Sequence, residues 1–353
     1  MRYTTFGRRS GLRVSELALG TGSFGTAWGH GAEPAEARRI FDGYVEAGGN
    51  FFDCADTYQN GQAETLLGEF VAADRDRFVV ASKYTLGADP SGPAVRAGNS
   101  RKAMMTAVEA SLRRLKTDYI DLYWVHMADG LTPTEEIVRG FDDLVRAGKI
   151  LYAGLSDFPA WRAARAATLA ELRGWAPLVG LQVEYSLVER TPDRELLPLA
   201  EGLGLGAALW SPLGGGLLTG KYRRGEQGRL DRMKILVHAE TTAQKTTVLD
   251  TVLAIAGELG ATPGQVAIAW LRHRTARSST ALIPILGANN RAQLDDNLGA
   301  LAVRLSEAQA AHLTDVSTVA LGFPYETLAP GGFGLRIAGG REELLEPRGA
   351  PVA

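Results

Sequence analysis

The sequence predicts an α/β fold, a closed (β/α)8 TIM barrel, from three observations. Short apolar runs alternate with stretches of helical period along most of the chain, which favours parallel strand–helix units. Eight such units can be counted. Polar residues close several of the apolar runs, and barrels of this kind keep their functional groups at that end of the strands. An open doubly wound sheet is the alternative, but only Gly20-Thr21-Gly22 resembles its glycine-rich turn.

The composition is that of an ordinary globular chain. It has 353 residues, of which 45% are hydrophobic and 22% charged, and a formal net charge of −2. This balance shows no excess of positive charge that would indicate binding to nucleic acid or to an anionic membrane. No apolar run approaches the ~18 residues of a membrane span. The one cysteine, Cys54, excludes an intrachain disulfide and fits a reducing cytoplasm. We therefore expect a cytoplasmic protein with one domain over 1–353 and no membrane or nucleic-acid partner.

The first half of the chain supplies the first four strand–helix units. Residues 1–16 predict a hairpin, because two short strand patterns flank the turn-rich stretch 7–11. The helix over 34–47 is predicted by apolar side chains at helical spacing, from Ala37 to Tyr44. Asn99 or Ser100 is expected to cap the helix over 100–115. The predicted strands are 17–20, 50–53, 78–83 and 119–126, and the remaining helices are 63–73 and 134–147.

The second half continues the alternation and adds a C-terminal helix. The predicted strands are 150–156, 178–184, 206–210 and 281–286. The predicted helices are 159–172, 193–203, 243–260, 264–273 and 291–301, followed by the extra helix 306–316. The barrel is thus expected over about 17–301, with the C-terminal helix and a Gly/Pro-rich tail over 302–353.

Two long segments interrupt the alternation. Residues 85–98 follow the third strand, and residues 211–242 follow the seventh and open with a glycine-rich stretch. Long loops within a compact fold are often functional, and both follow the carboxyl ends of strands. We expect them to border the site.

Four polar residues could form a proton-transfer site. Asp53 ends an apolar run and Tyr58 follows it in the next loop, while Lys83 and His126 close the next two strands. Adjacent strands lie ~4.8 Å apart, so these side chains can converge at the mouth of a barrel. An ammonium near the phenol is expected to lower the tyrosine pKa, and a carboxylate to hold the lysine charged. With a histidine bonding the substrate oxygen, the group could protonate a carbonyl as hydride reaches its carbon.

These residues carry a resemblance to the aldo-keto reductase superfamily. The stretch from Asp53 to Tyr58 resembles the family signature Asp-x-Ala-x-x-Tyr, and the runs ending in Lys83 and His126 resemble its lysine and histidine motifs. The resemblance extends from Leu12 to about Leu313, and the chain looks most similar to the branch that contains the potassium-channel β subunits. It implies that Tyr58 is the general acid, tuned by Lys83 and Asp53, with His126 orienting the carbonyl.

The resemblance also implies sites for a nicotinamide cofactor. Ser156, Asp157 and Gln182 correspond to the residues that hold the carboxamide, although Asp157 stands where asparagine is usual and cannot donate to the amide oxygen. Trp210 would stack on the nicotinamide. Gly22 would line the cofactor site near Asp53. The loop over the pyrophosphate would comprise Ser211, Pro212, Leu213, Gly214, Gly216 and Lys221.

The adenosine end is implied by residues 287–297, which open the last barrel helix. Gly287, Asn289, Gln293, Asp296 and Asn297 align with its contacts. Many relatives have arginine where Asn289 stands, so Arg291, Arg229 or Arg232 would have to supply charge for a 2′-phosphate. NADP(H) is the expected cofactor on family grounds, and NAD(H) is the alternative.

A small-molecule carbonyl compound is the expected partner, in a pocket lined by Trp28, Tyr58, His126 and Met127, with the tail around Phe323 and Tyr325 as further candidates. The histidines show no ligand spacing, so we expect no metal. The sequence leaves open whether the protein is a monomer or a homo-oligomer.

Two other functions compete with an NADPH-dependent carbonyl reductase. A nucleotide-binding regulatory subunit is one, but His126 stands where channel β subunits carry asparagine. A Schiff-base aldolase with Lys83 as nucleophile is the other, and it leaves Tyr58, Trp210 and residues 287–297 without a role.

Overall fold

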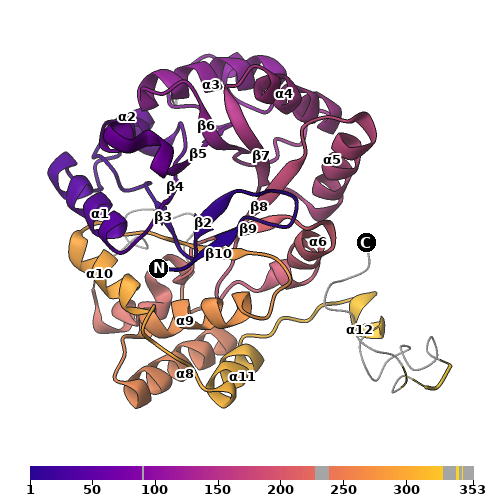
Figure 1. The fold of residues 1–353 in the computed structure, drawn as a ribbon. Helices are drawn as coiled ribbons and strands as arrows, with labels where there is room; N and C mark the ends of the chain where they lie inside the picture. Colours follow the sequence, from indigo (N-terminus) through magenta and orange to yellow (C-terminus); the bar gives the residue numbers. More distant parts are fainter. Residues whose placement is uncertain (90, 227–237, 329–338, 342–343, 345–353) are drawn as a thin grey trace.

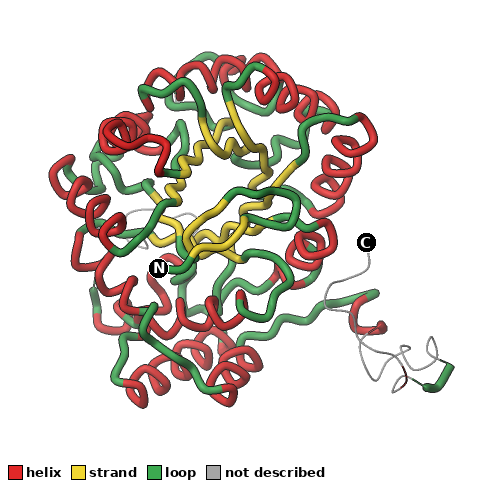
Figure 2. Tube along the Cα trace, in the orientation of Figure 1, coloured by secondary structure: helices red, strands yellow, loops and turns green. Residues whose placement is uncertain are grey.

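The computed structural model describes the whole chain except residues 90, 227–237, 329–338, 342–343 and 345–353. Among the described residues, eight parallel strands close into a barrel in the order β3-β4-β5-β6-β7-β8-β9-β10, with β10 paired to β3 (Figure 1). Helices surround the strands on all sides (Figure 2). The expected (β/α)8 barrel and the N-terminal hairpin are therefore confirmed.

The strands are short and lie close to their predicted positions. The hairpin pairs β1 (Tyr3–Thr5) with β2 (Arg13–Ser15). The barrel strands are β3 (Ala18–Gly20), β4 (Phe51–Asp53), β5 (Val79–Tyr84), β6 (Ile120–Val125), β7 (Ile150–Ser156), β8 (Leu178–Glu184), β9 (Gly206–Trp210) and β10 (Leu282–Leu286).

The helices that cover the barrel also follow the prediction. They are α1 (Pro34–Glu46), α2 (Gln62–Val71), α3 (Arg101–Leu115), α4 (Thr134–Arg146), α5 (Ala160–Arg173), α6 (Leu196–Leu203), α8 (Ala243–Leu259), α9 (Pro263–Thr275) and α10 (Arg291–Gly299). The extra helix α11 (Glu307–Val316) packs on α8, and a short helix α12 (Tyr325–Leu328) lies in the tail. Ser100 caps α3 by accepting from the Ala103 amide, as expected.

The N-terminal hairpin crosses one end of the barrel and closes it (Figure 1). Phe6 is fully buried there and contacts Phe51 and Trp124 edge to face. Gly180 and Gly206 leave room for its ring, because a Cβ on Gly206 would lie 2.8 Å from the Phe6 Cδ2 atom. The apolar layer that follows fills the barrel interior, so only the carboxyl ends of the strands remain for a site.

Two elements differ from the prediction. Helix α6 begins at Leu196 rather than at Asp193, because Pro192 opens a separate turn and the Asp193 carboxylate accepts hydrogen bonds from Tyr185 and Arg190. The tail is not wholly without structure, since α12 forms there.

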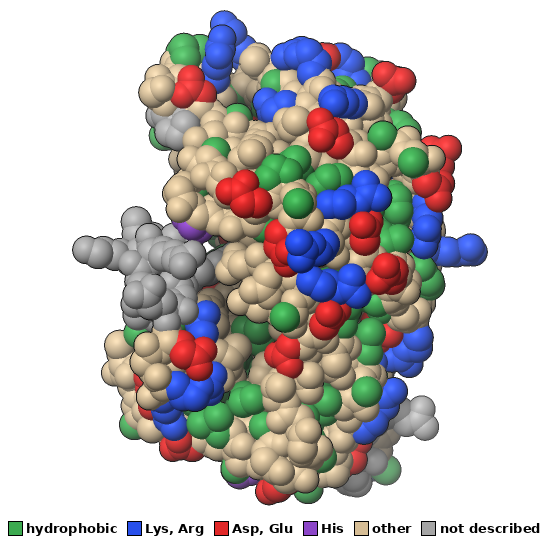
Figure 3. Space-filling view, turned by 90° about the vertical axis from the view of Figure 1, so that its left-hand side faces the viewer, with side chains coloured by type: hydrophobic (Ala, Val, Ile, Leu, Met, Phe, Trp, Pro, Cys, Tyr) green, Lys and Arg blue, Asp and Glu red, His purple; other side chains and the backbone are tan. Residues whose placement is uncertain are grey.

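The visible surface mixes the two signs of charge, with no field of one sign on the face shown in Figure 3. Within the described ranges, no single helix meets the length and apolarity needed to cross a bilayer; α8 and α9 meet them only when taken together across a 97° bend.

Candidate active site

Asp53, Tyr58 and Lys83 meet at the carboxyl end of the barrel, as the sequence predicts. The Lys83 ammonium is fully buried and donates hydrogen bonds to the Asp53 Oδ2 atom at 2.6 Å, the Cys54 carbonyl at 2.8 Å and the Tyr58 hydroxyl at 3.1 Å. Three partners satisfy all three of its donors. The lysine is therefore held in one position, with the phenol in reach.

The electrostatics of Lys83 argue against a Schiff base. Burial acts to lower its pKa, but the charge and hydrogen bonds of Asp53 and Tyr58 outweigh burial and raise the pKa above its ordinary value. A nucleophilic lysine must lose its proton, which the same contacts oppose. The aldolase alternative therefore has no support in this geometry.

Tyr58 keeps its proton more firmly than the sequence suggests. Burial raises the pKa of the phenol, the nearby Lys83 charge lowers it, and Asp53 raises it again, with a net shift upward. The ammonium lowers this pKa as expected, but the burial of the phenol outweighs it, so the net shift is opposite to the expected one. A protonated phenol beside a fixed cation can still act as a proton donor.

His126 faces the phenol from the end of β6, two strands along the barrel. The two rings meet edge to face, with 5.8 Å between their centres. Burial, and then the Lys83 charge, lower the pKa of the imidazole to about 3, so the ring is neutral at ordinary pH. Its Nδ1 atom is buried and has no hydrogen-bond partner among the described residues. A neutral ring beside the phenol can donate one hydrogen bond to a substrate oxygen.

The expected pocket residues border this group. Trp28 lies edge to face with Tyr58, with 6.2 Å between ring centres, and a Cβ on Gly22 would touch the Tyr58 ring at 3.8 Å. Met127 follows His126 and accepts at its carbonyl from the Asn99 side chain. An aromatic wall thus faces the proton donor.

Two glutamines that the sequence analysis did not single out hold the Trp28 loop in place. The Gln59 amide donates to the Gly22 and His30 carbonyls and accepts from the Trp28 amide, and Gln62 accepts from the Thr26 amide. Gln59 is buried and has a left-handed backbone, with φ 50°. The sequence feature that could have indicated these two glutamines is the polar run directly after Tyr58.

A buried polar cluster behind the site was also missed. Glu64 is fully buried and accepts hydrogen bonds from Ser82 and Arg114. Burial, and then the Glu64 charge, raise the pKa of Asp56 to about 7. Ser82 directly precedes Lys83 and Asp56 lies two residues before Tyr58, so this cluster borders the backbone from which both site residues project.

A second side of the site, called here the second wall of the barrel mouth, is formed by residues at the carboxyl ends of β7, β8 and β9. Ser156 pairs with Gln182 across the strands, and the Gln182 amide donates to the Asp53 Oδ1 atom at 2.8 Å. Trp210 donates from its ring nitrogen to the Asp157 Oδ1 atom at 3.1 Å. The Ser156 hydroxyl is buried and has no partner among the described residues. A buried hydroxyl without a partner is costly, and a bound amide would satisfy it.

The glycine-rich segment after β9 forms a tight loop. Residues 214–216 all have positive φ, which only glycine adopts freely. The Ser211 hydroxyl accepts from the Gly215 amide, and Pro212 and Leu213 lead into the turn. A Cβ on Gly216 would lie 2.9 Å from the Lys221 Nζ atom, so the cation sits directly over this glycine. Close backbone and one cation suit a phosphate group.

The segment expected at the adenosine end is placed at the start of α10, where Gly287 and Asn289 are exposed. Three of its side chains have partners within the protein. Asp296 accepts from Thr262 and Gln265, and Asn297 donates to the Gly287 carbonyl. The Gln293 side chain accepts from the Asn289 amide.

Arg291 is a poor partner for a 2′-phosphate. Its guanidinium donates to Asp295 at 2.7 Å and to Glu46 at 3.1 Å, which directs it toward α1. The suggestion that it supplies the missing charge is therefore not supported. Arg229 and Arg232 lie outside the described residues.

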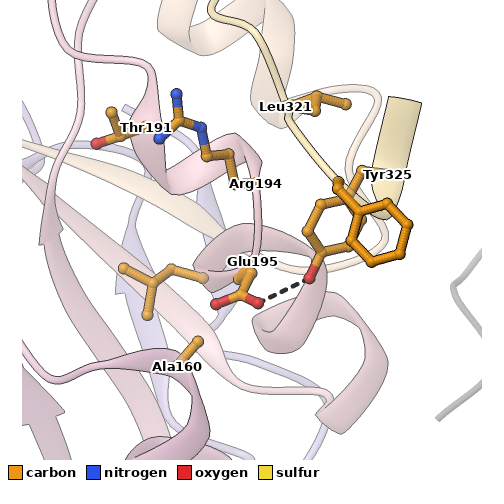
Figure 4. Close-up of a pocket in the computed structure, with 8 residues that line it drawn as sticks. Ala160, Thr191, Arg194, Glu195, Leu321 and Tyr325 are labelled. Atoms are coloured by element: carbon orange, nitrogen blue, oxygen red, sulfur yellow. Dashed lines mark hydrogen bonds between the residues drawn. The ribbon is translucent and has the colours of Figure 1, made fainter. Parts of the chain in front are cut away.

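Two further groups of side chains are not part of the contact between Asp53, Lys83 and Tyr58. Glu184, Glu189 and His238 bring possible metal-ligand atoms within 4.8 Å of one another, which spacing along the sequence did not show. Phe323 and Tyr325 border a groove with Arg194 and Glu195 at α6, where the Tyr325 hydroxyl bonds Glu195 (Figure 4). The structure therefore places Phe323 and Tyr325 beside the start of α6.

Comparisons with known proteins show which family the chain resembles along most of its length. A family model described as "Aldo/keto reductase family" matches residues 16–318. The chain is 34% identical over 329 residues to the norsolorinic acid reductase of Aspergillus flavus, covering 90% of this chain and 82% of that protein. It is 36% identical over 325 residues to an uncharacterized oxidoreductase of Bacillus subtilis, covering 90% and 96%.

An aryl-alcohol dehydrogenase of Phanerodontia chrysosporium, named for NADP(+), is 35% identical over 336 residues, covering 89% of this chain and 86% of that protein. These matches do not show the expected similarity to the potassium-channel β subunits, which stays a prediction.

Proposed function

Because the chain belongs to the aldo/keto reductase family, we propose that it reduces an aldehyde or ketone to an alcohol with NADP(H), and that Tyr58 supplies the proton. NAD(H) is the alternative cofactor. The observation that carries the proposal is the buried contact of Lys83 with both Asp53 and Tyr58, next to a neutral His126. The experiment that tests it is carbonyl-dependent oxidation of NADPH, described in the Discussion.

The residues present fit a nicotinamide cofactor. The unpartnered Ser156 hydroxyl, with Gln182, would hold the carboxamide, and the loop of residues 211–221 would hold the pyrophosphate through its amides and Lys221. Asn289 at the start of α10 would face the adenosine end, where helix amides favour phosphate. The bound cofactor supplies the hydride that reduces the carbonyl carbon.

The protein's own part is to bind and protonate the substrate oxygen. Tyr58 and His126 both reach the space in front of the mouth, so one oxygen can accept from the phenol and from the imidazole. As negative charge develops on that oxygen, the phenolic proton moves to it and Lys83 stabilises the phenolate that remains. Asp53 keeps the ammonium charged and in place throughout.

We further propose that aromatic carbonyl compounds are preferred. Trp28 lies beside Tyr58 and gives the pocket an apolar, planar wall. One relative is named an aryl-alcohol dehydrogenase, which points to the same class.

Trp210 gives a binding signal that does not depend on turnover. Titration with NADP⁺ should quench tryptophan fluorescence, and Trp210→Ala should remove most of the change, because a stacked ring would lie on this indole. The control is Trp161→Ala, whose indole is 68% exposed on α5 and should leave the quench intact. An unchanged quench in the Trp210 variant would argue against stacking.

Asn289 should limit the preference for NADPH over NADH. It offers hydrogen bonds without charge, and charge-assisted bonds to phosphate are roughly twice as strong as neutral ones. Asn289→Arg should raise the ratio of kcat/KM with NADPH to that with NADH by about tenfold, or ~1.4 kcal/mol.

The matched control is Ala292→Arg, which adds the same charge to an exposed position in the first turn of α10. It should change the ratio much less. If wild type prefers NADH, or if the two variants behave alike, residue 289 does not face the 2′-phosphate.

A further inference from the structure

Asp157 is fixed at the end of β7 with its carboxylate against the second wall of the barrel mouth. Its backbone is left-handed, with φ 48°, a conformation that aspartate and asparagine tolerate. Its amide donates to the Gln182 carbonyl at 3.0 Å, and its carbonyl accepts from the Ala128 amide. The side chain accepts from the Trp210 ring nitrogen at 3.1 Å. Two backbone hydrogen bonds thus fix the position of Asp157, and the bond from Trp210 fixes its carboxylate beside the indole.

The space that this carboxylate borders is where hydride must be delivered. A carbonyl oxygen bonded to Tyr58 and His126 would place its carbon at the carboxyl end of the barrel, where Ser156, Asp157 and Trp210 also lie at the ends of β7 and β9. The carboxylate thus borders the ring that carries the hydride, if the proposed function holds.

Few charged groups act on Asp157. Burial raises its pKa most, the Trp210 bond lowers it, Glu184 raises it and Lys83 lowers it, with a result of about 6. Glu184 and Lys83 are the charged side chains that act on it; Asp53 pairs with Lys83, His238 contacts Glu184, and His126 and Asp129 lie on the loop whose Ala128 amide bonds the Asp157 carbonyl. His126 is neutral, and hydrogen bonds from its own turn hold Asp129 ionised, with a pKa of about 2 despite partial burial. Neither changes charge near pH 6.

We propose that the Asp157 carboxylate selects the oxidised over the reduced cofactor, by placing a negative charge beside a ring that is positive only when oxidised. This deepens the proposed function and rests on it. An asparagine at this position would offer similar shape and hydrogen bonding without the charge. An opposite charge within about 4–6 Å lowers the pKa of a carboxyl by roughly one to three units, which is a factor of ten or more in the equilibrium between its charged and neutral forms.

The proposal predicts that a proton is released from the protein when the oxidised cofactor binds. A positive ring beside Asp157 stabilises the ionised carboxylate, so binding of NADP⁺ at about pH 6 should expel a proton from Asp157. NADPH brings no such charge and should expel none from this residue. The affinity for NADP⁺ relative to NADPH should therefore rise about tenfold as the pH is raised from 5 to 8.

The experiment measures dissociation constants of NADP⁺ and NADPH by fluorescence titration between pH 5 and 8, for wild type and Asp157→Asn. Calorimetry in two buffers of different ionisation enthalpy counts the protons released at pH 6. Wild type should show the tenfold change and release protons with NADP⁺, while Asp157→Asn should show a ratio that does not vary with pH and a smaller release. Glu195→Gln, which neutralises a carboxyl in the groove of Figure 4, should behave as wild type.

Equal pH dependence in wild type and Asp157→Asn would overturn the inference while leaving the reductase proposal standing. Failure of wild type to bind either nucleotide would overturn the proposed function, and this inference with it.

Discussion

Tyr58→Phe is expected to lower kcat for carbonyl reduction by about 10²–10⁴-fold, the range for loss of a positioned general acid. Among the described partners of the Lys83 ammonium, the phenol of Tyr58 is the group that carries a transferable proton at neutral pH, because burial raises its pKa. The hydroxyl is the only atom removed, so the fold and the dissociation constant for NADPH should be retained. The measurement is kcat and KM with a reactive aldehyde, beside fluorescence titration of the cofactor.

Tyr123→Phe is the matched control. Its hydroxyl is buried on β6 with no partner among the described residues, so its loss should leave turnover and stability nearly unchanged. Near-wild-type kcat in Tyr58→Phe would show that Tyr58 is not the proton donor.

Lys83→Met is expected to lower both turnover and stability. Turnover should fall about 10²–10³-fold, because the cation that stabilises the phenolate is gone. The free energy of unfolding should fall by about 3–5 kcal/mol, because Asp53 is left as an uncompensated charge that is 2% exposed. The folded-state pKa of Lys83 is raised, so its contribution is fully present below the unfolded value of ~10.4 and is lost only as the pH rises through the folded pKa.

A double variant separates the two effects. Lys83→Met with Asp53→Asn removes the unpaired charge while keeping an oxygen for the Gln182 amide, so it should regain much of the stability and none of the turnover. Denaturant unfolding and kcat are measured on the same samples. Recovery of turnover in the double variant would show that Lys83 serves only to neutralise Asp53.

The barrel could be predicted because its strands are buried on both faces. Such strands are continuous apolar runs, and the polar residue that ends each run marks the mouth, which is how Asp53, Lys83 and His126 were found. Tyr58 followed from its place one loop beyond Asp53.

What could not be predicted depends on contacts between distant segments. The ion pair of Arg291 with Glu46 joins the two ends of the barrel sequence, and nothing local indicates it. The pKa of Tyr58 depends on how far burial, which raises it, outweighs the Lys83 ammonium, which lowers it. The sequence does not show how deeply the phenol is buried. Gln59 and Gln62 lie in a polar run whose role is visible only once the Trp28 loop is folded over them.

The most direct test of the account is the loss of NADPH absorbance with a panel of aromatic aldehydes, aliphatic aldehydes and ketones, with NADH run in parallel. The account predicts carbonyl-dependent oxidation of NADPH by wild type, fastest with aromatic aldehydes, and recovery of the matching alcohol in equal amount. Tight binding of NADPH with no oxidation by any member of the panel would contradict it and favour a nucleotide-binding regulatory role instead.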